Sequence, residues 1–135
     1  MEITEKITVG LSREETMTVG VQHTARALGS GSLPVLGTPA MTALMEQAAT
    51  NLAQALLPEG WTSVGTALSI AHVAATPVGA VVRAVAKVEA VEGRRLRYTV
   101  EAFDEADPIG QGTHERYVVE AEKFMAKAQD KLNKK

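Results

Sequence analysis

The spacing of apolar residues changes once along this chain, from a helical period to an alternating one. Behind Thr38, apolar residues recur every three or four positions, at Met41, Leu44, Met45, Ala48, Leu52, Ala55 and Leu56. This spacing is typical of an amphipathic helix, and Pro39 suits the first helical position. We expect one long helix that ends near Leu57, because Pro58 and Gly60 follow it.

From about Thr62 to Ala121, apolar and polar residues alternate, which is the period of half-buried β-strands. The alternation predicts four strands joined by short turns, at residues 66–76, 80–91, 94–103 and 111–121. Short turns favour an antiparallel meander. Weaker alternation within residues 3–22 predicts an opening strand, and residues 28–34 predict a loop before the helix.

One strand, one long helix and four further strands predict an α+β fold, with residues 1–135 forming a single domain. The antiparallel sheet has to wrap around the one long central helix to bury it, which is the hotdog shape, although the pattern alone leaves several topologies open for a sheet with one covering helix. The tail beyond Ala121 predicts a short amphipathic helix that carries Phe124 and Leu132 on its apolar side.

The composition excludes several classes of function. No cysteine occurs among the 135 residues, so thiolate catalysis and cysteine-ligated zinc are excluded, and a reducing cytoplasm is compatible. A net charge of -2 with interspersed signs, together with few aromatic residues, disfavours nucleic acid as a partner. No stretch approaches about 20 apolar residues and no signal peptide is recognisable, so we expect a cytoplasmic protein with no membrane partner.

Two polar residues border the apolar stripe of the predicted helix. No lysine or arginine stands three or four positions from Glu46 to pair with it. Glu46 is therefore either a carboxylate whose head reaches water or a group with a chemical role. Thr38 precedes the helix-starting Pro39, where its hydroxyl suits an N-cap.

The predicted strands carry three further candidates. His72 shares a strand face with Thr66 and Ile70, so it points to the packed side, where a satisfied core or interface histidine would also explain it. Arg116 lies beside His114 on one face, which suits a surface ion pair between strands. The three histidines of the chain lie on different elements without ligand spacing, so we expect no metal.

Four motifs follow one another between about residues 33 and 124: V-x-x-T-P-A-M-x-x-L-M-E, G-T-x-x-x-x-x-H-x-A-A-T-P-x-G, E-G-R-R-L and G-T-H-E-R. Together they resemble the hotdog thioesterases related to fluoroacetyl-CoA thioesterase. The resemblance implies hydrolysis of a small or medium acyl-CoA thioester, with CoA as part of the substrate and no other cofactor. It also implies a homodimer or dimer of dimers, with the site at the subunit interface.

The resemblance also implies roles for individual residues. The threonine, glutamate and histidine of that family map by motif onto Thr38, Glu46 and His72, as catalytic residues. Substrate contacts map onto Gly65 and Arg116. A glutamate can attack the carbonyl or deprotonate a water, and the residues do not choose between these roles. The helix N-terminus offers free N–H groups for the oxyanion.

Leu36 marks a departure from the family pattern. The fluoroacetyl-CoA enzyme carries a phenylalanine there, as V-F-x-T, whereas this chain has Leu36 as a substrate-binding candidate. We expect a more open pocket with a graded preference among short or medium acyl groups. Two other functions remain open from the residues alone: a hotdog enoyl-CoA hydratase and a non-catalytic acyl-CoA binding module.

Overall fold

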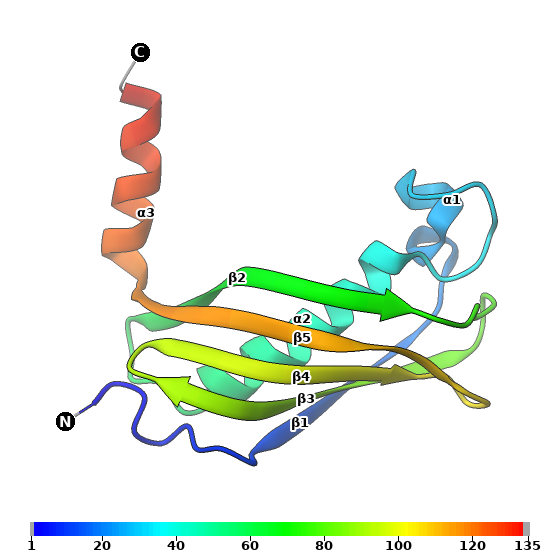
Figure 1. Ribbon diagram of the computed structural model, residues 1–135. Helices are drawn as coiled ribbons and strands as arrows, with labels where there is room; N and C mark the ends of the chain where they lie inside the picture. Colours follow the sequence, from blue (N-terminus) through cyan, green and yellow to red (C-terminus); the bar gives the residue numbers. More distant parts are fainter. Residues whose placement is uncertain (1, 134–135) are drawn as a thin grey trace.

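The computed structural model describes residues 2–133 and contains one antiparallel sheet and one long helix (Figure 1). The strands are β1 (Ser12–Thr18), β2 (Trp61–His72), β3 (Val81–Glu92), β4 (Arg95–Phe103) and β5 (Pro108–Glu120). The helices are η1 (Val21–His23), α1 (Ala25–Leu28), α2 (Thr38–Gln54), α3 (Ala121–Gln129) and η2 (Asp130–Asn133). The predicted order of strand, long helix and four strands is confirmed, and the fold is α+β.

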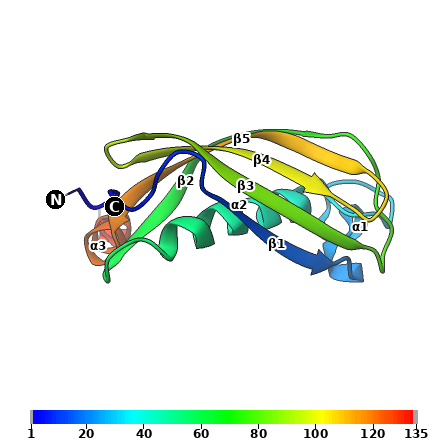
Figure 2. The ribbon, with the colours of Figure 1, turned by 90° about the horizontal axis from the view of Figure 1, so that it is seen from below.

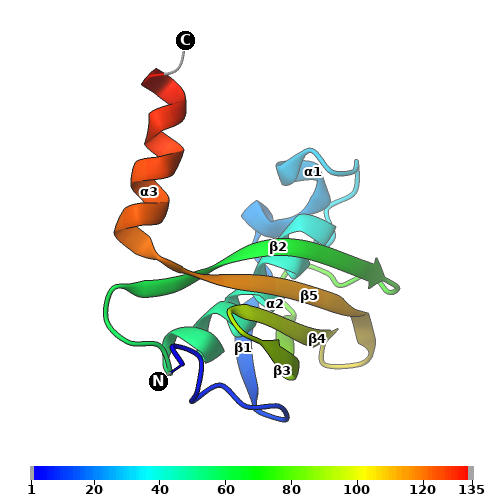
Figure 3. The ribbon, with the colours of Figure 1, turned by 60° about the vertical axis from the view of Figure 1, so that its left-hand side comes forward.

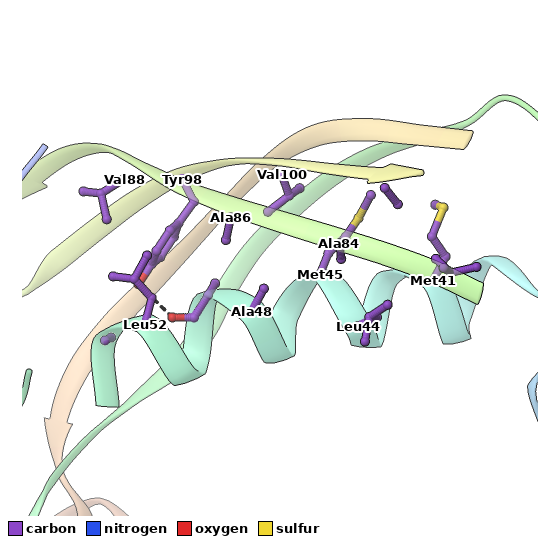
Figure 4. Packing of buried hydrophobic residues seen from close by; sticks show 14 of the residues in the cluster. Met41, Leu44, Met45, Ala48, Leu52, Ala84, Ala86, Val88, Tyr98 and Val100 are labelled. Atoms are coloured by element: carbon purple, nitrogen blue, oxygen red, sulfur yellow. Dashed lines mark hydrogen bonds between the residues drawn. The ribbon is translucent and has the colours of Figure 1, made fainter. Parts of the chain in front are cut away.

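Helix α2 lies against one face of the curved sheet, as the view from below shows (Figure 2). Its predicted apolar stripe is buried, at Met41, Leu44, Met45, Ala48 and Leu52. These side chains point toward alternate residues of β3 and β4 (Figure 4), namely Ala84, Ala86, Val88, Tyr98 and Val100. The Tyr98 hydroxyl donates a hydrogen bond to the Ala49 carbonyl at 3.2 Å, so the polar tip of the largest core residue is satisfied.

The start of α2 differs from the prediction. Gly37 is the N-cap residue and Thr38 is already helical, so the predicted N-cap role of Thr38 is wrong. A Cβ at Gly37 would lie 3.0 Å from the backbone nitrogen of Ala25, so only glycine lets the two segments approach this closely. The hydroxyl of Thr38 is thereby available for another partner. At its other end α2 stops at Gln54, three residues before the expected Leu57.

The strand order in the sheet is β1-β3-β4-β5-β2, so the meander prediction is only partly correct. Strands β3, β4 and β5 follow one another as antiparallel neighbours, but β2 pairs with β5 instead of β3. Residues 73–80 are too long for a hairpin turn, and they pair with the segment before α2. The Leu36 amide donates to the Thr76 carbonyl at 2.8 Å, which carries this connection across the end of the helix.

Strand β2 forms one edge of the sheet and contains a β-bulge. The register with β5 shifts between Gly65 and Ala67, so Thr66 is the extra residue. Its hydroxyl bonds to the Glu115 backbone and side chain, outside the face that His72 occupies. The prediction that Thr66 shares a face with His72 is therefore wrong, because the bulge inverts the alternation.

Helix α3 continues from β5 and projects beyond the β2 edge (Figure 3). It confirms the predicted tail helix up to residue 133, and residues 134–135 lie outside the described part of the chain. None of its residues is buried, and Phe124 stays 42% exposed. Within residues 2–133, no helix combines the length and the apolar character needed to cross a membrane.

Candidate active site

Two groups of polar side chains contact α2 at different points, the first at Thr38 and the second at Glu46. At its first turn, the Thr38 Oγ1 lies 2.8 Å from Nδ1 of His72, which ends strand β2. One turn further, the Thr42 hydroxyl donates to the Thr38 carbonyl, as threonines in helices often do. The hydroxyl of Thr38 is therefore held against an imidazole instead of capping the helix.

His72 has one nitrogen bonded and one nitrogen without a partner. Within residues 2–133, its Nε2 is buried and makes no hydrogen bond, which is unfavourable by about 1–3 kcal/mol for a buried polar atom. Burial lowers the pKa of His72 below the ordinary value of 6.5, with the Ala74 backbone acting less strongly in the opposite direction. The ring is therefore neutral near pH 7 and is missing one partner.

A cavity of about 360 Å³ opens beside this pair. It is lined by Ala25, Ser30, Val35, Leu36, Thr38, His72, Val73, Ala74 and Ala75. Leu36 lines the cavity, although the residue is only 2% exposed. Most residues of the lining are apolar, with Ser30 and the Thr38–His72 pair as the polar groups, as small-molecule sites commonly have.

The second group of polar residues surrounds the carboxylate of Glu46, two turns further along α2. Its Oε2 lies 3.8 Å from Nη1 of Arg116 and 3.9 Å from Nε2 of His114. A Cβ at Gly65 would lie 3.0 Å from this oxygen, so the missing side chain leaves space above the carboxylate. The structure therefore brings Glu46, Gly65 and Arg116 together.

Arg116 is buried, and the prediction of a surface ion pair for it is wrong. Only 6% of the residue is exposed, because it lies on the inner face of β5. Its Nε donates to the Ser63 hydroxyl at 2.8 Å and its Nη2 to the Ser63 carbonyl at 3.0 Å. The outward-facing Glu115 instead lies 3.8 Å from Arg95.

His114 and Ser63 are site residues that the sequence interpretation did not select. Both are buried, and both bond to Arg116. Alternation in β5 sets His114 on the same face as the buried Val118, which is the signal that could have identified it. Ser63 carried no comparable signal, because its partner stands 53 positions away.

The two groups do not meet within one protomer. Eight residues separate Thr38 from Glu46, which at 1.5 Å per residue is about 12 Å along the helix axis. Seven residues separate Gly65 from His72, or about 23 Å along the strand. Among the described residues, no group of three or more His, Asp or Glu side chains is arranged to hold a metal ion.

Comparison with known proteins gives concordant matches. The family model described as fluoroacetyl-CoA-specific thioesterase matches residues 19–122. The fluoroacetyl-CoA thioesterase of Streptantibioticus cattleyicolor is 46% identical over 97 residues, which are 72% of this chain and 70% of that protein. A solved structure of the fluoroacetyl-CoA thioesterase FlK has 40% identity and a TM-score of 0.88, covering 93% of this chain and 97% of the other. A hot-dog-like protein from Thermanaerovibrio acidaminovorans has 29% identity and a TM-score of 0.88, with 97% of each chain covered.

The sheet, the helix and these matches place the protein in the hotdog class of thioester hydrolases. The predicted hotdog fold is confirmed. Within that class, the chain belongs to the fluoroacetyl-CoA-specific thioesterase family, and the resemblance inferred from its four motifs is correct.

Proposed function

We propose that this protein hydrolyses short or medium acyl-CoA thioesters at a site composed of Thr38 and His72 from one protomer and Glu46 from a second. The observation that carries the proposal is the unpartnered Nε2 of His72: its neighbour Thr38 lies about 12 Å along α2 from Glu46, the carboxylate that should act with it. Groups that act on one carbonyl have to lie within about 3–3.5 Å of the reacting atoms. A second copy of the chain can supply the missing carboxylate.

The β2 edge is suited to pairing with a second copy. Its twelve residues contain no charge and no proline, the features that usually protect an edge strand from pairing. Leu68 is 41% exposed in its middle. An antiparallel pair of β2 strands centred between Leu68 and Ser69 would set His72 opposite Gly65 of the partner subunit, with Cα atoms about 4.5–5.5 Å apart.

This register would bring the two halves of the site together. Glu46 lies against Gly65 within each protomer, so the partner's Glu46 would approach the free Nε2 of His72. Two such sites would form, related by the twofold axis of the dimer. We therefore propose a homodimer as the active form. Sedimentation of the protein would show whether two dimers pair further.

The chemistry requires attack on the carbonyl carbon, breakage of the C–S bond and protonation of the CoA thiolate. In one route Glu46 takes a proton from the attacking water and His72 relays that proton to the leaving sulfur. In the other route Glu46 attacks the carbonyl itself, and the water that then hydrolyses the resulting anhydride supplies the proton that His72 relays to the sulfur. The backbone N–H of Thr38 makes no hydrogen bond within residues 2–133, so it can donate to the oxyanion. The amides of Ala40 and Met41 already donate to Gly37, which leaves fewer free donors than expected.

Gly65, Arg116 and Leu36 would contact the substrate. Gly65 leaves room above Glu46, and Arg116 supplies a fixed positive charge beside it. Leu36 lines the cavity next to Thr38, where the acyl group would lie. We propose that residues 1–135 act as one domain and that the reaction uses no metal. We also propose a cytoplasmic location, because a chain without cysteine is compatible with a reducing cytoplasm.

Alanine substitution of Glu46 tests the catalytic part. Glu46→Ala should lower turnover of the best acyl-CoA by at least about 10²-fold while the melting curve stays unchanged. Thiol release measures the reaction directly, because enoyl hydration would change the enoyl absorbance without releasing CoA and simple binding would do neither. Parent-rate hydrolysis by folded Glu46→Ala protein would refute the role of this carboxylate.

Mixing two inactive variants tests the shared site. Equal amounts of His72→Ala and Glu46→Ala protomers, unfolded and refolded together, should form half mixed dimers with one intact site each. Because half of the dimers are mixed and one of the two sites in each mixed dimer is intact, about a quarter of the parent activity should be recovered. If mass spectrometry shows mixed dimers but no activity returns, the site is not shared between two protomers. A fully active protein that sediments as a monomer would contradict the shared site as well.

A further inference from the structure

His114 is a buried imidazole whose two nitrogens are both bonded, and the proposed chemistry does not use it. It projects from β5 to the inner face of the sheet and is 2% exposed. Its Nδ1 lies 2.9 Å from the Ala67 carbonyl oxygen, and its Nε2 lies 3.1 Å from Nη1 of Arg116. The ring also stacks on Tyr98, with 6.1 Å between ring centroids.

These two contacts determine which nitrogen carries the proton. A carbonyl oxygen can only accept, so Nδ1 donates to Ala67. A guanidinium can only donate, so Nε2 accepts from Arg116. The geometry therefore selects the neutral ring with its proton on Nδ1, and burial, which lowers the pKa of His114, favours the same form.

Three of the five N–H donors of Arg116 have partners, one on each guanidinium nitrogen, and these bonds fix the plane of the group. Ser63 holds Nε and Nη2, and His114 holds Nη1. The carboxylate of Glu46 stays 3.8 Å from Nη1, whereas a hydrogen-bonded ion pair would have about 2.7–2.9 Å between nitrogen and oxygen. Within residues 2–133, the Glu46 side chain accepts no hydrogen bond.

We infer that His114 is a positioning residue, which holds the Arg116 guanidinium near Glu46 and prevents the two from closing into a hydrogen-bonded ion pair. This inference rests on the proposed role of Glu46 and adds a reason for the histidine in the G-T-H-E-R motif. A carboxylate bound directly by arginine has its lone pairs occupied and is a poorer base or nucleophile. At 3.8 Å the positive charge remains close, but the carboxylate oxygen stays free.

The bulge in β2 makes this arrangement possible. The extra residue Thr66 shifts the register, and the carbonyl of the following Ala67 accepts from His114. A Cβ at Gly65 would lie 3.2 Å from the His114 ring and 3.4 Å from Arg116, so the same glycine leaves space over both. The edge strand thus sets the position of the histidine, and the histidine sets the position of the arginine.

Two substitutions at one position separate the acceptor from the shape. His114→Phe keeps an aromatic ring against Tyr98 but removes the acceptor, so Arg116 can turn onto Glu46. We expect kcat to fall at least about 30-fold with KM within about threefold of the parent. His114→Gln returns an oxygen near the position of Nε2, and we expect kcat within about fivefold of the parent. Thr99→Val, on the outer face of β4, serves as the control and should leave kcat unchanged.

A double-mutant comparison distinguishes this role from a direct one. Because His114 acts through Arg116, His114→Gln and His114→Phe should have equal kcat in an Arg116→Ala background. Parent kcat in folded His114→Phe would overturn the inference, as would a Gln variant no better than Phe or a difference that persists without Arg116. If His114→Phe does not fold, His114→Leu takes its place in the same comparison. Glu46→Ala is measured in the same assay. High activity of Glu46→Ala would refute the proposed function. An inactive Glu46→Ala protein together with a fully active His114→Phe protein would refute only the positioning role of His114.

Discussion

Replacing Gly112 with alanine tests how closely β2 and β5 have to pack for the site to exist. Gly112 faces Ile70 across the pair, and a Cβ there would lie 2.9 Å from both the Ser69 carbonyl carbon and the Ile70 Cδ1. The Ser69 carbonyl oxygen would be closer still. Ordinary contact begins at 3.4 Å, so relieving the two 2.9 Å contacts alone needs a shift of about 0.5 Å, and the closer carbonyl oxygen requires the β2 backbone to move by more than that. That strand carries both Gly65 and His72, so the displacement reaches both halves of the site.

Gly110, two residues earlier on the same face, is the matched control. A Cβ there would lie 2.6 Å from the sulfur of Met41, which belongs to a flexible side chain, and 3.1 Å from the Ala71 carbonyl oxygen, a much milder backbone contact than those at Gly112. Overpacking costs about 1–3 kcal/mol, and an alanine recovers about 0.4–1 kcal/mol by restricting the unfolded chain. We expect Gly112→Ala to lie at the upper end of this range and Gly110→Ala near 1 kcal/mol or below.

Thermal unfolding at one fixed protein concentration measures the difference. In a domain of this size 1 kcal/mol corresponds to roughly 3–5 °C, so Gly112→Ala should lower Tm by about 10 °C and Gly110→Ala by less than about 5 °C. Thiol release at a temperature where both variants are folded should show the larger loss for Gly112→Ala. Equal Tm values for the two variants would refute the argument from backbone contact.

Three further predictions concern pH, selectivity and the core. Burial lowers the pKa of His72 and His114 below 6.5, so on acidification the unfolded chain takes up protons that the folded chain does not. The urea midpoint of unfolding should therefore be constant above about pH 7 and fall toward about pH 5.5. A midpoint that rises on acidification would contradict this. The parent protein should prefer fluoroacetyl-CoA over acetyl-CoA by a factor in kcat/KM of at most about 200, with Leu36→Phe measured for comparison. A preference of several orders of magnitude in the parent would exclude an open pocket at Leu36. Tyr98→Phe removes the buried bond to Ala49, so equilibrium unfolding should show a loss of about 1 kcal/mol with kcat unchanged, and no loss would mean that this bond contributes nothing.

Local pattern was sufficient for the elements but not for their partners. The α2 stripe from Met41 to Leu52 could be predicted because burial of one helix face follows from the spacing of its own residues. The alternation in β3 and β4 was equally informative. Pairing of β2 with β5 depends on where residues 73–80 run, and those residues are held by hydrogen bonds to Leu36 and Val19 from distant parts of the chain.

The site shows the same division. The motifs proposed Thr38, Glu46 and His72 as catalytic residues, but they could not show that Thr38 and Glu46 lie about 12 Å apart along one helix, each with a different partner. Charge suggested a surface position for Arg116, whereas Ser63 and His114 together make its burial possible. A buried arginine is recognisable only once its hydrogen-bond partners are known.

The cavity beside Thr38 and His72 takes most of its wall from connecting segments instead of the core. Ser30, Val35 and Leu36 precede α2, and Val73, Ala74 and Ala75 follow β2. Ser30, Val35, Val73 and Ala75 are at least partly exposed and lie outside the core cluster, so substitutions there cost little stability, whereas Leu36 is buried in that cluster. Substitutions can therefore reshape the proposed acyl pocket while the proposed catalytic groups stay on rigid elements. Members of one such lineage can diverge in substrate without first acquiring compensating changes in their cores.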